Sequence, residues 1–291
     1  MLAALGLARG AAAQQLEPRA YSPAPVGTNI AGLAYVYSSG DVSTDASLPL
    51  QDVSVHLHAF APFYSRTFGL WGRQASALVT APFGMGHAEG ALSGEARSAD
   101  RTGFGDPRLR LAVNLLGGPA MTPAEFRAPK PVPTLGASLV VSAPLGQYDA
   151  SKLFNLGTNR WAFKPELGFS QPLADWSLEA YAGVWLFTDN GDFLGGHRRA
   201  QDPLLATQAH VVRSIGLHAW GALDFTYFTG GAVTVDGRSA GGRQKNTRLG
   251  ATVSFPIVEH QSVKLSYSKG VTARVGGNFD TAALTWQYVW R

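Results

Sequence analysis

The sequence contains no cysteine among its 291 residues. This absence excludes a disulfide scaffold, a thiolate metal site and a cysteine nucleophile. Charged residues are also scarce, at 15% of the chain against about 25% in an average soluble domain. Apolar residues make up an ordinary 45%, while the chain has 34 glycines and 17 prolines. The low charge is therefore not the result of a larger apolar core.

Long hydrophobic runs are absent too. No window of about 20 residues, the length of a transmembrane helix, is continuously apolar, and the best candidate, Leu135–Val141, lies between Pro133 and Pro144. Aromatic residues amount to 11% of the chain, which excludes intrinsic disorder because such a chain buries ample apolar surface. The net charge is +4 with no basic run longer than Arg198-Arg199, so we predict no nucleic-acid partner.

The first residues resemble the end of a secretory signal. An apolar stretch leads to Ala11-Ala12-Ala13, which fits the small-residue cleavage site of an exported protein. A basic start is missing, and the alternative is a frayed helical turn. We predict a signal peptide at 1–13, truncated at its start, an N-terminal extended segment at 14–27 and a β-barrel at 28–291.

Apolar and polar residues alternate along most of the chain after residue 27. In one run Leu223, Phe225 and Tyr227 alternate with Asp224 and Thr226, which gives a strand one apolar and one polar face. Runs of about ten residues exceed the usual strand length of about six and match the length that crosses a bilayer at a tilt. We predict twelve strands, at 28–38, 53–66, 70–82, 104–116, 133–144, 161–171, 176–188, 203–214, 216–229, 246–257, 260–270 and 280–290.

The connections between these runs differ in length. Those after the odd-numbered strands are long and polar, such as 39–52, 83–103 and 145–160, whereas most of the others are tight turns. The connection at 117–132 is the exception and would be a long periplasmic loop. Long loops at one end and tight turns at the other are typical of bacterial outer-membrane barrels. The fold prediction is therefore all-β, an antiparallel transmembrane β-barrel of about 12 strands, with a soluble β-sandwich as the alternative.

Aromatic residues at the strand ends agree with a barrel that has a girdle at each membrane interface. The residues expected at the two rims are Trp71, Trp176, Phe255 and Trp290 at one, and Tyr37, Trp161, Tyr227 and Tyr267 at the other. The last strand resembles the C-terminal strand of outer-membrane proteins, although Arg291 follows the final aromatic. We predict a location in the bacterial outer membrane, with outer-membrane lipid, lipopolysaccharide and the barrel-assembly machinery as partners.

Charged residues occupy the polar face of several predicted strands. They must face away from lipid, because Arg or Lys at the bilayer midplane costs about 2–4 kcal/mol. One interpretation is a charged lumen that selects solutes, and the other is a set of ion pairs that fills a narrow barrel. Both stay open, since both signs of charge are present. The candidate lumen-lining residues are Arg108, Arg110, Lys164, Glu166, Glu179, Asp224, Arg248 and Lys264.

Few motifs in the sequence are compatible with catalysis or metal binding. Ser266 and Lys269 fit an S-x-x-K pattern, but on a strand they would point to opposite faces. We interpret His56 and His58, which share a strand face, as a polar pair lining the lumen, because no third metal ligand is visible. We predict no catalytic residue, no metal and no cofactor. The enzymatic alternative is an outer-membrane lipid hydrolase that uses His56, His58 or His210 with a nearby serine.

Four segments carry a family resemblance. They are Thr102–Arg110 (TGFGDPRLR), Ala143–Tyr148 (APLGQY), Asn155–Glu166 (NLGTNRWAFKPE) and Gln201–Leu204 (QDPL). With them, the chain from about Tyr21 to Arg291 resembles the outer-membrane transporters named for the MetA pathway of phenol degradation. The resemblance implies a barrel that passes hydrophobic or aromatic compounds.

The predicted function is an outer-membrane β-barrel channel for passive uptake of small hydrophobic or aromatic solutes. An outer-membrane hydrolase and a structural or adhesive barrel without transport are the alternatives. Aromatic residues in or beside the external loops would capture ligand or pack one loop on another. They are Phe83, Phe104, Tyr148, Phe154, Phe193 and Phe279.

Overall fold

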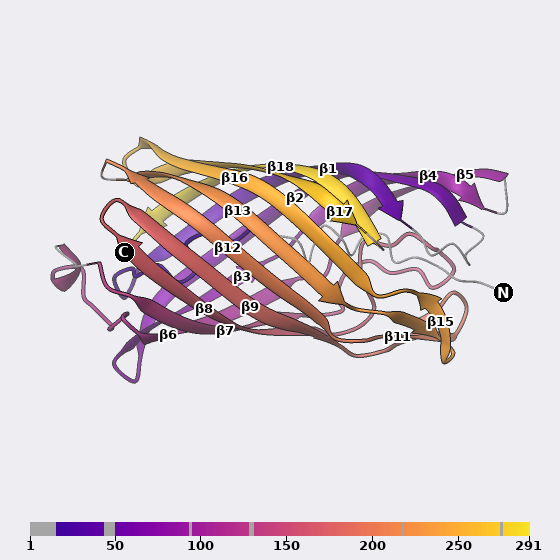
Figure 1. Cartoon of the computed structure of the whole chain (residues 1–291), viewed down its shortest axis with the longest axis horizontal. Coiled ribbons are helices and arrows are strands. Elements are labelled where there is room, and N and C mark those ends of the chain that lie inside the picture. The colour runs from indigo at the N-terminus through magenta and orange to yellow at the C-terminus, as the bar shows by residue number, and fades with distance from the viewer. Residues whose placement is uncertain (1–15, 44–49, 93–94, 128–130, 217, 274–275) are drawn as a thin grey trace.

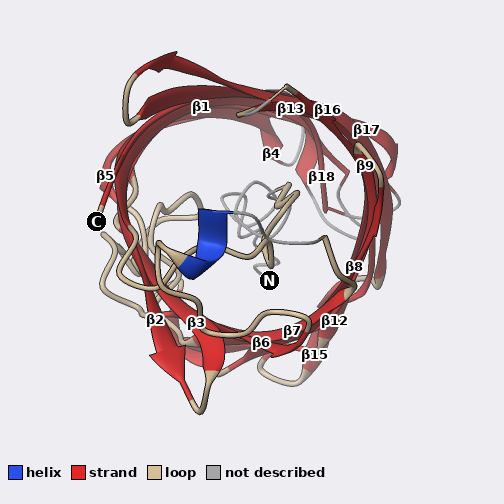
Figure 2. Ribbon diagram, turned by 90° about the vertical axis from the view of Figure 1, so that its left-hand side faces the viewer, coloured by secondary structure: helices blue, strands red, loops and turns tan. Residues whose placement is uncertain are grey.

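The computed structural model describes residues 16–43, 50–92, 95–127, 131–216, 218–273 and 276–291. The predicted signal peptide lies outside these residues. Twelve strands form one antiparallel ring (Figures 1 and 2). In ring order they are β1 (Asn29–Ser43), β2 (Leu50–Leu70), β3 (Arg73–Thr80), β6 (Arg108–Leu116), β7 (Thr134–Ser142), β8 (Ala162–Leu173), β9 (Trp176–Phe187), β12 (Leu204–Ile215), β13 (Ala219–Gly230), β16 (Gln244–Val258), β17 (Gln261–Ala273) and β18 (Gly276–Trp290).

The first and last strands close the barrel. Asn29 of β1 lies opposite Trp290 of β18 on one side and opposite Arg66 of β2 on the other. Every edge of the ring is therefore paired, which removes the exposed backbone groups that a membrane cannot tolerate. The predicted twelve-stranded antiparallel barrel is confirmed.

Tight turns join the strands at the end of the barrel where the C-terminus lies (Figure 1). The β2–β3 turn consists of Trp71 and Gly72, whose φ angles of 50° and 72° are those of a type I′ hairpin. Longer connections leave the opposite end. Because outer-membrane barrels have short periplasmic turns and long external loops, the end with the C-terminus is the periplasmic end and the opposite end is the outer end.

One predicted loop is a hairpin instead. The predicted loop at 83–103 contains β4 (Phe83–Leu92) and β5 (Glu95–Phe104), which follow β3 and precede β6 (Figure 1). β4 pairs with the first half of β2, and β5 pairs with β4. Pro82 and Pro107 lie in the two interruptions, where a residue without an N–H is tolerated. The first residues of β5 are exposed on both faces, so the segment lacks the apolar alternation that marks a membrane strand.

The predicted loops at 189–202 and 230–245 also contain strands. They form a small four-stranded sheet at the outer end, made of β10 (Asn190–Phe193), β11 (His197–Gln201), β14 (Val233–Val235) and β15 (Arg238–Gly241). The long connection before β7 contains a 3-10 turn, Glu125–Arg127. In the described residues no helix is long and apolar enough to cross a membrane.

The two faces of the barrel wall differ in polarity. Large apolar side chains are exposed on the outer face, among them Leu223 (67%) and Leu167 (55%), whereas Thr226 and Thr252 are fully buried on the inner face. This distribution is the inverse of a soluble protein and is that of a membrane barrel. The predicted girdle residues Trp71, Trp161, Trp176, Phe255 and Tyr267 are exposed on the outer surface.

The interpretation of His56 and His58 as lumen-lining residues is wrong. Both side chains are exposed on the outer face of β2, where His58 accepts or donates a hydrogen bond at Tyr35 (2.8 Å) and packs against Tyr37. The inner face of the same stretch carries the buried Val55. The faces reverse in polarity here because this part of β2 stands beyond the membrane, where the outer face meets water.

Candidate functional site: the lumen and its N-terminal segment

Residues 16–28, here called the lumen segment, lie inside the barrel. Tyr21 is 2% exposed, and its ring fills a slot between Gly136 of β7 and Gly168 of β8, which are register partners. A Cβ at either glycine would overlap the Tyr21 ring. The ring also contacts Tyr181 edge to face at 5.2 Å. The two glycines therefore make room for one aromatic residue from a distant part of the chain.

Hydrogen bonds hold the lumen segment to the wall. The Tyr21 hydroxyl donates to Glu166 (3.1 Å), and the backbone N–H of Arg19 donates to Glu179 (2.7 Å). Nearer the periplasmic end, Gln74 accepts from the N–H of Ala24 (2.7 Å). These anchors are polar, in contrast to the apolar packing that holds a protein core. The segment predicted at 14–27 as extended thus lies in the lumen over its described part, a placement that its own sequence did not indicate.

A cluster of four cations surrounds Glu17 of the lumen segment. This basic cluster consists of Arg108, Arg110, Lys164 and Lys264. Lys164 Nζ lies 3.8 Å from the Glu17 carboxylate and 2.9 Å from Glu166, and the other three cations also act on the charge of Glu17. Arg110 further packs over the Tyr21 ring at 4.9 Å. All four were predicted as lumen-lining from the sequence.

The other predicted lumen residues have different partners. Glu179 binds the lumen segment and accepts from Tyr181 (2.6 Å). Asp224 contacts His210 Nδ1 at 2.6 Å and accepts from Thr252 at 2.8 Å, and Arg248 donates to Ser268 at 2.7 Å. All three are buried. The structure therefore distributes the eight residues over four groups of interacting side chains along the inner wall, namely the basic cluster with Glu166, and the separate surroundings of Glu179, Asp224 and Arg248.

An apolar patch lines the inner wall nearer the outer end. Its buried members are Val140, Ala162, Trp185, Leu204, Ala206 and Phe228, with Phe187 packed against them. Trp185 and Phe187 are stacked at 6.4 Å and 10°. Arg160 lies over the Phe187 ring at 4.0 Å, and Lys164 Nζ lies 5.6 Å from the Trp185 ring centre. Sequence reasoning missed this patch, although Trp185 and Phe228 fall on the otherwise polar faces of their strands.

The resemblance motifs meet at the outer end of the lumen. Asp106, in the interruption between β5 and β6, accepts hydrogen bonds from the N–H groups of Gly146 (3.0 Å) and Thr158 (2.9 Å). It thereby fixes the 143–161 connection over the barrel mouth. Within that connection Phe154 is 2% exposed and packs with Val55.

The six aromatic residues predicted at the outer mouth divide into two kinds. Phe154, Phe193 and Phe279 are buried, at 2–4% exposure, and therefore pack loops and strands together. Phe104 is 58% exposed and contacts Phe83 edge to face at 5.3 Å. The hydroxyl of Tyr148 donates to the carbonyl of Asp192 and joins two connections.

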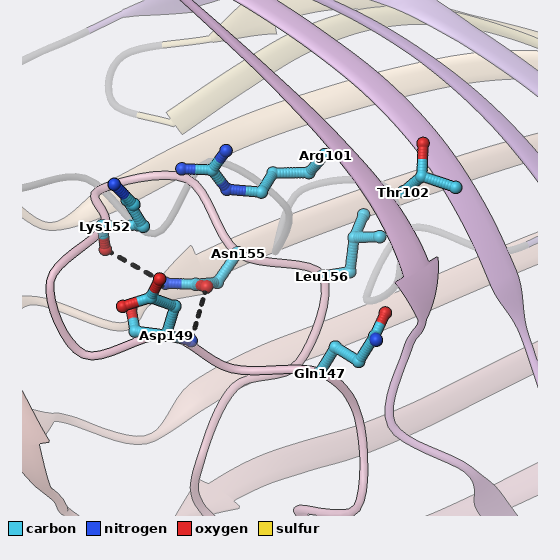
Figure 3. A pocket seen from close by; sticks show the side chains of 7 residues that line it. All are labelled: Arg101, Thr102, Gln147, Asp149, Lys152, Asn155 and Leu156. Carbon is cyan, nitrogen blue, oxygen red and sulfur yellow. Dashed lines mark hydrogen bonds between the residues drawn. The ribbon is translucent and has the colours of Figure 1, made fainter.

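A small pocket opens beside this connection (Figure 3). It has a volume of about 200 Å³ and is lined by Arg101, Thr102, Gln147, Asp149, Lys152, Asn155 and Leu156. The pKa of Asp149 is below its usual value, because the hydroxyl and the backbone N–H of Ser151 donate to its carboxylate. Two cations thus face one ionised carboxylate, which makes the mouth electropositive at this point.

The histidines considered for catalysis lie in different settings. His56 Nδ1 contacts both Ser39 (3.0 Å) and Tyr37 (3.3 Å) on the outer surface. Among the described residues, Nε2 of the buried His210 has no hydrogen-bond partner. The described part of the chain contains no group of three His, Asp or Glu residues placed to hold a metal.

A closed barrel with an apolar exterior, a charged interior and a folded-in segment defines a class: this is a β-barrel channel of the bacterial outer membrane. The family model described as "Putative MetA-pathway of phenol degradation" matches residues 37–287, so the chain belongs to that family. No curated protein matches the sequence.

Solved structures share the fold at low sequence identity. The COG4313 outer membrane channel from Pseudomonas putida F1 superposes with a TM-score of 0.78 at 20% identity, covering 95% of this chain and all of that one. The β domain of the Bordetella autotransporter BrkA gives 0.57 at 13% identity, covering 91% and 100%. The CymD monoaromatic hydrocarbon channel gives 0.50 at 10% identity, covering 100% and 95%.

Proposed function

We propose that this channel takes up small hydrophobic or aromatic compounds by passive diffusion. The observation that carries the proposal is the apolar patch, because aromatic and aliphatic side chains on the inner wall of a barrel would give an apolar solute a surface to bind. Removing roughly 100 Å² of apolar solute surface from water contributes about 2.5 kcal/mol. This is enough for weak capture and still allows release.

The geometry suggests a path for the solute. A compound would enter at the outer mouth, bind at the apolar patch and pass the lumen segment to reach the periplasm. The lumen segment narrows the route, so its polar anchors at Glu166, Glu179 and Gln74 would determine how readily the solute passes. In this proposal the eight predicted charged residues surround the route. Four of them bind the lumen segment directly: Arg110, Lys164, Glu166 and Glu179. Membrane lipid covers the outer face, and contacts with lipopolysaccharide and the assembly machinery stay predictions.

One structural neighbour agrees with this proposal, since CymD is described as a monoaromatic hydrocarbon channel. The family description likewise refers to phenol degradation. Neither identifies the solute of this chain. The hydrolase alternative has weaker support, because in the described residues neither His56 nor His210 lies between a serine and a carboxylate in the order that nucleophilic catalysis requires.

A transport assay with paired variants tests the proposal. Trp185→Gln places a polar group in the apolar patch, whereas Leu186→Ala changes the adjacent outward-facing residue, which is 42% exposed. In a deletion strain, we expect Trp185→Gln to slow uptake of labelled toluene at limiting concentration and Leu186→Ala to leave it near the wild-type rate. Equal uptake by the deletion strain, the wild type and Trp185→Gln would refute passive aromatic uptake.

A further inference from the structure

The basic cluster around Glu17 contains more positive charge than the lumen segment neutralises. Four cations converge there, and Lys164 is shared between Glu17 and Glu166. Asp106 acts on Arg108 and Asp224 acts on Lys264. Both of these carboxylates are already engaged, Asp106 by Thr158 and Asp224 by His210. Glu17 and Glu166 are therefore the carboxylates that balance the cations in this part of the lumen, and only Glu17 belongs to the lumen segment.

Glu17 is bound loosely for a carboxylate that is only partly exposed. Its Oε2 atom is buried without a hydrogen bond, and the nearest cation lies 3.8 Å away. Nε and Nη2 of Arg110 are also buried without hydrogen-bond partners among the described residues. A guanidinium can bind a carboxylate through two parallel hydrogen bonds, which are stronger than bonds between neutral groups. The cluster thus holds donors that a better-placed carboxylate could use.

The apolar patch and the basic cluster lie side by side on the inner wall, since Val140 of the patch is the register partner of both Arg110 and Lys164. Lys164 belongs to both, because its Nζ lies 3.8 Å from Glu17 and 5.6 Å from the Trp185 ring centre. A molecule that places an aromatic ring on Trp185 would therefore bring a group attached to that ring close to Lys164. Cation and ring side by side match a solute with an apolar ring and one negative charge.

We propose that Glu17 occupies an anion site which the carboxylate of an aromatic monocarboxylate takes in its place during uptake. This inference rests on the proposed function and narrows its substrate class. The solute carboxylate displaces that of Glu17 from Lys164 and Arg110, and the ring packs on the apolar patch. Release of the Glu17 carboxylate removes one contact that holds the lumen segment before Tyr21, while the hydrogen bond from the backbone N–H of Arg19 to Glu179 keeps the segment in the lumen.

Equilibrium dialysis of the purified full-length protein in detergent tests the inference, with benzoate and toluene as probes. Glu17→Gln removes the internal competitor but keeps the side-chain shape. We expect it to tighten benzoate binding about tenfold, the change that a charge-assisted hydrogen bond of about 1.4 kcal/mol produces, and to leave toluene binding unchanged. Glu17→Asp keeps the charge and should bind benzoate as the wild type does. Glu125→Gln, in the periplasmic connection, is the control.

A second variant tests the cation. Lys164→Gln should weaken benzoate binding about tenfold and leave toluene binding intact, while the exposed Lys269→Gln should change neither. Unchanged or weaker benzoate binding by Glu17→Gln, or an equal loss of both probes in Lys164→Gln, would overturn the inference. If Trp185→Gln abolishes toluene binding, the proposed function is still supported. Failure of the anion-site inference can therefore be distinguished from failure of the proposed function.

Discussion

The two halves of the lumen are built from the same strands and serve different partners. On β9, the periplasmic half carries Glu179 and Tyr181, which bind the lumen segment, while the outer half carries Trp185 and Phe187 of the apolar patch. All four residues lie on one face, because they are separated by even numbers of residues. The alternation of a barrel strand therefore fixes which side chains point inward. It does not fix their polarity, which changes along the strand.

The difference has an energetic reason. Polar and charged groups in a narrow lumen need partners, and in the periplasmic half the lumen segment supplies them through the backbone N–H groups of Arg19 and Ala20, which donate to Glu179 and Tyr181. Apolar side chains in the outer half have no such need and pack against one another. Under the proposed function, solute capture by the apolar patch and restriction by the lumen segment would therefore be separate tasks of the inner wall.

The largest effect is expected from a deletion that prevents closure of the barrel, on which both halves of the lumen depend. Deleting residues 286–291 takes away the part of β18 that pairs with Leu33 and with Val263, so the sheet cannot close at its periplasmic end. We expect no folded species with heat-dependent gel mobility and loss of the protein from outer-membrane fractions. Removing Arg291 alone is the control and should leave both unchanged. Normal membrane levels of the longer deletion would contradict the role of β18 as the closing strand.

A substitution at the glycine slot tests the periplasmic half alone. Gly168→Val places a side chain where the Tyr21 ring lies, so the lumen segment should leave its position while the strands stay paired. We expect single-channel conductance in planar bilayers to rise several-fold. The outward-facing Leu167→Val, on the same strand, is the matched control. Conductance equal to the wild type would mean that the lumen segment does not restrict the channel.

Neutralising the cations distinguishes the two original interpretations of the lumen charges. If Arg108, Arg110 and Arg248 surround an open path, changing all three to Gln should shift ion selectivity toward cations, because selectivity follows the charges that face the pore. If they only hold the interior together, the same change should lower the melting temperature and leave the selectivity ratio as it was. Reversal potentials in a salt gradient and thermal unfolding separate the two outcomes.

The buried acid–histidine pair of the lumen gives a smaller effect. Asp224→Asn keeps the shape but removes the charge beside His210 and leaves weaker contacts to His210 and Thr252. Breaking a buried pair by removing one partner costs about 3–5 kcal/mol, so we expect a lower melting temperature, with Leu223→Ala on the outer face as the comparison. A melting temperature at or above that of the comparison would show that the pair contributes little.

Much of the fold could be predicted because a membrane imposes alternation on every strand that crosses it. Leu223, Phe225 and Tyr227 face lipid, and their periodicity located β13 within a few residues. Where the chain leaves the membrane this constraint ends. The first residues of β5 are exposed on both faces, and the His56 side of β2 faces water. The alternation of apolar and polar residues there either disappears or switches faces. This explains why residues 83–103 were predicted to be a loop and why His56 and His58 were assigned to the lumen.

The lumen segment and the apolar patch depend on contacts that no local pattern encodes. Tyr21 contacts Gly136 and Gly168, more than a hundred positions away. Nothing in the local sequence distinguishes these two glycines from the other glycines of the strands. Trp185 did carry a signal, since an aromatic residue on a polar face needs an apolar neighbour. That neighbour, its register partner Leu204 on β12, could be assigned only once the strand order around the ring was known.

The smallest effect is expected at a histidine outside the lumen, in the hairpin beyond the barrel wall. His87 of the β4–β5 hairpin has a pKa above its ordinary 6.5, chiefly because it shares a hydrogen bond of 2.8 Å with Asp100. A raised pKa means that protonation favours the paired hairpin. The stabilisation of the hairpin by the His87–Asp100 pair is therefore complete below the ordinary histidine pKa. It is lost as the pH rises through the raised pKa of His87. In an NMR titration, Asp100→Asn should return the His87 pKa toward 6.5, whereas Asp224→Asn should not move it. A His87 pKa that stays raised in Asp100→Asn would assign the shift to another group, with Glu89, 3.8 Å away, the next to test.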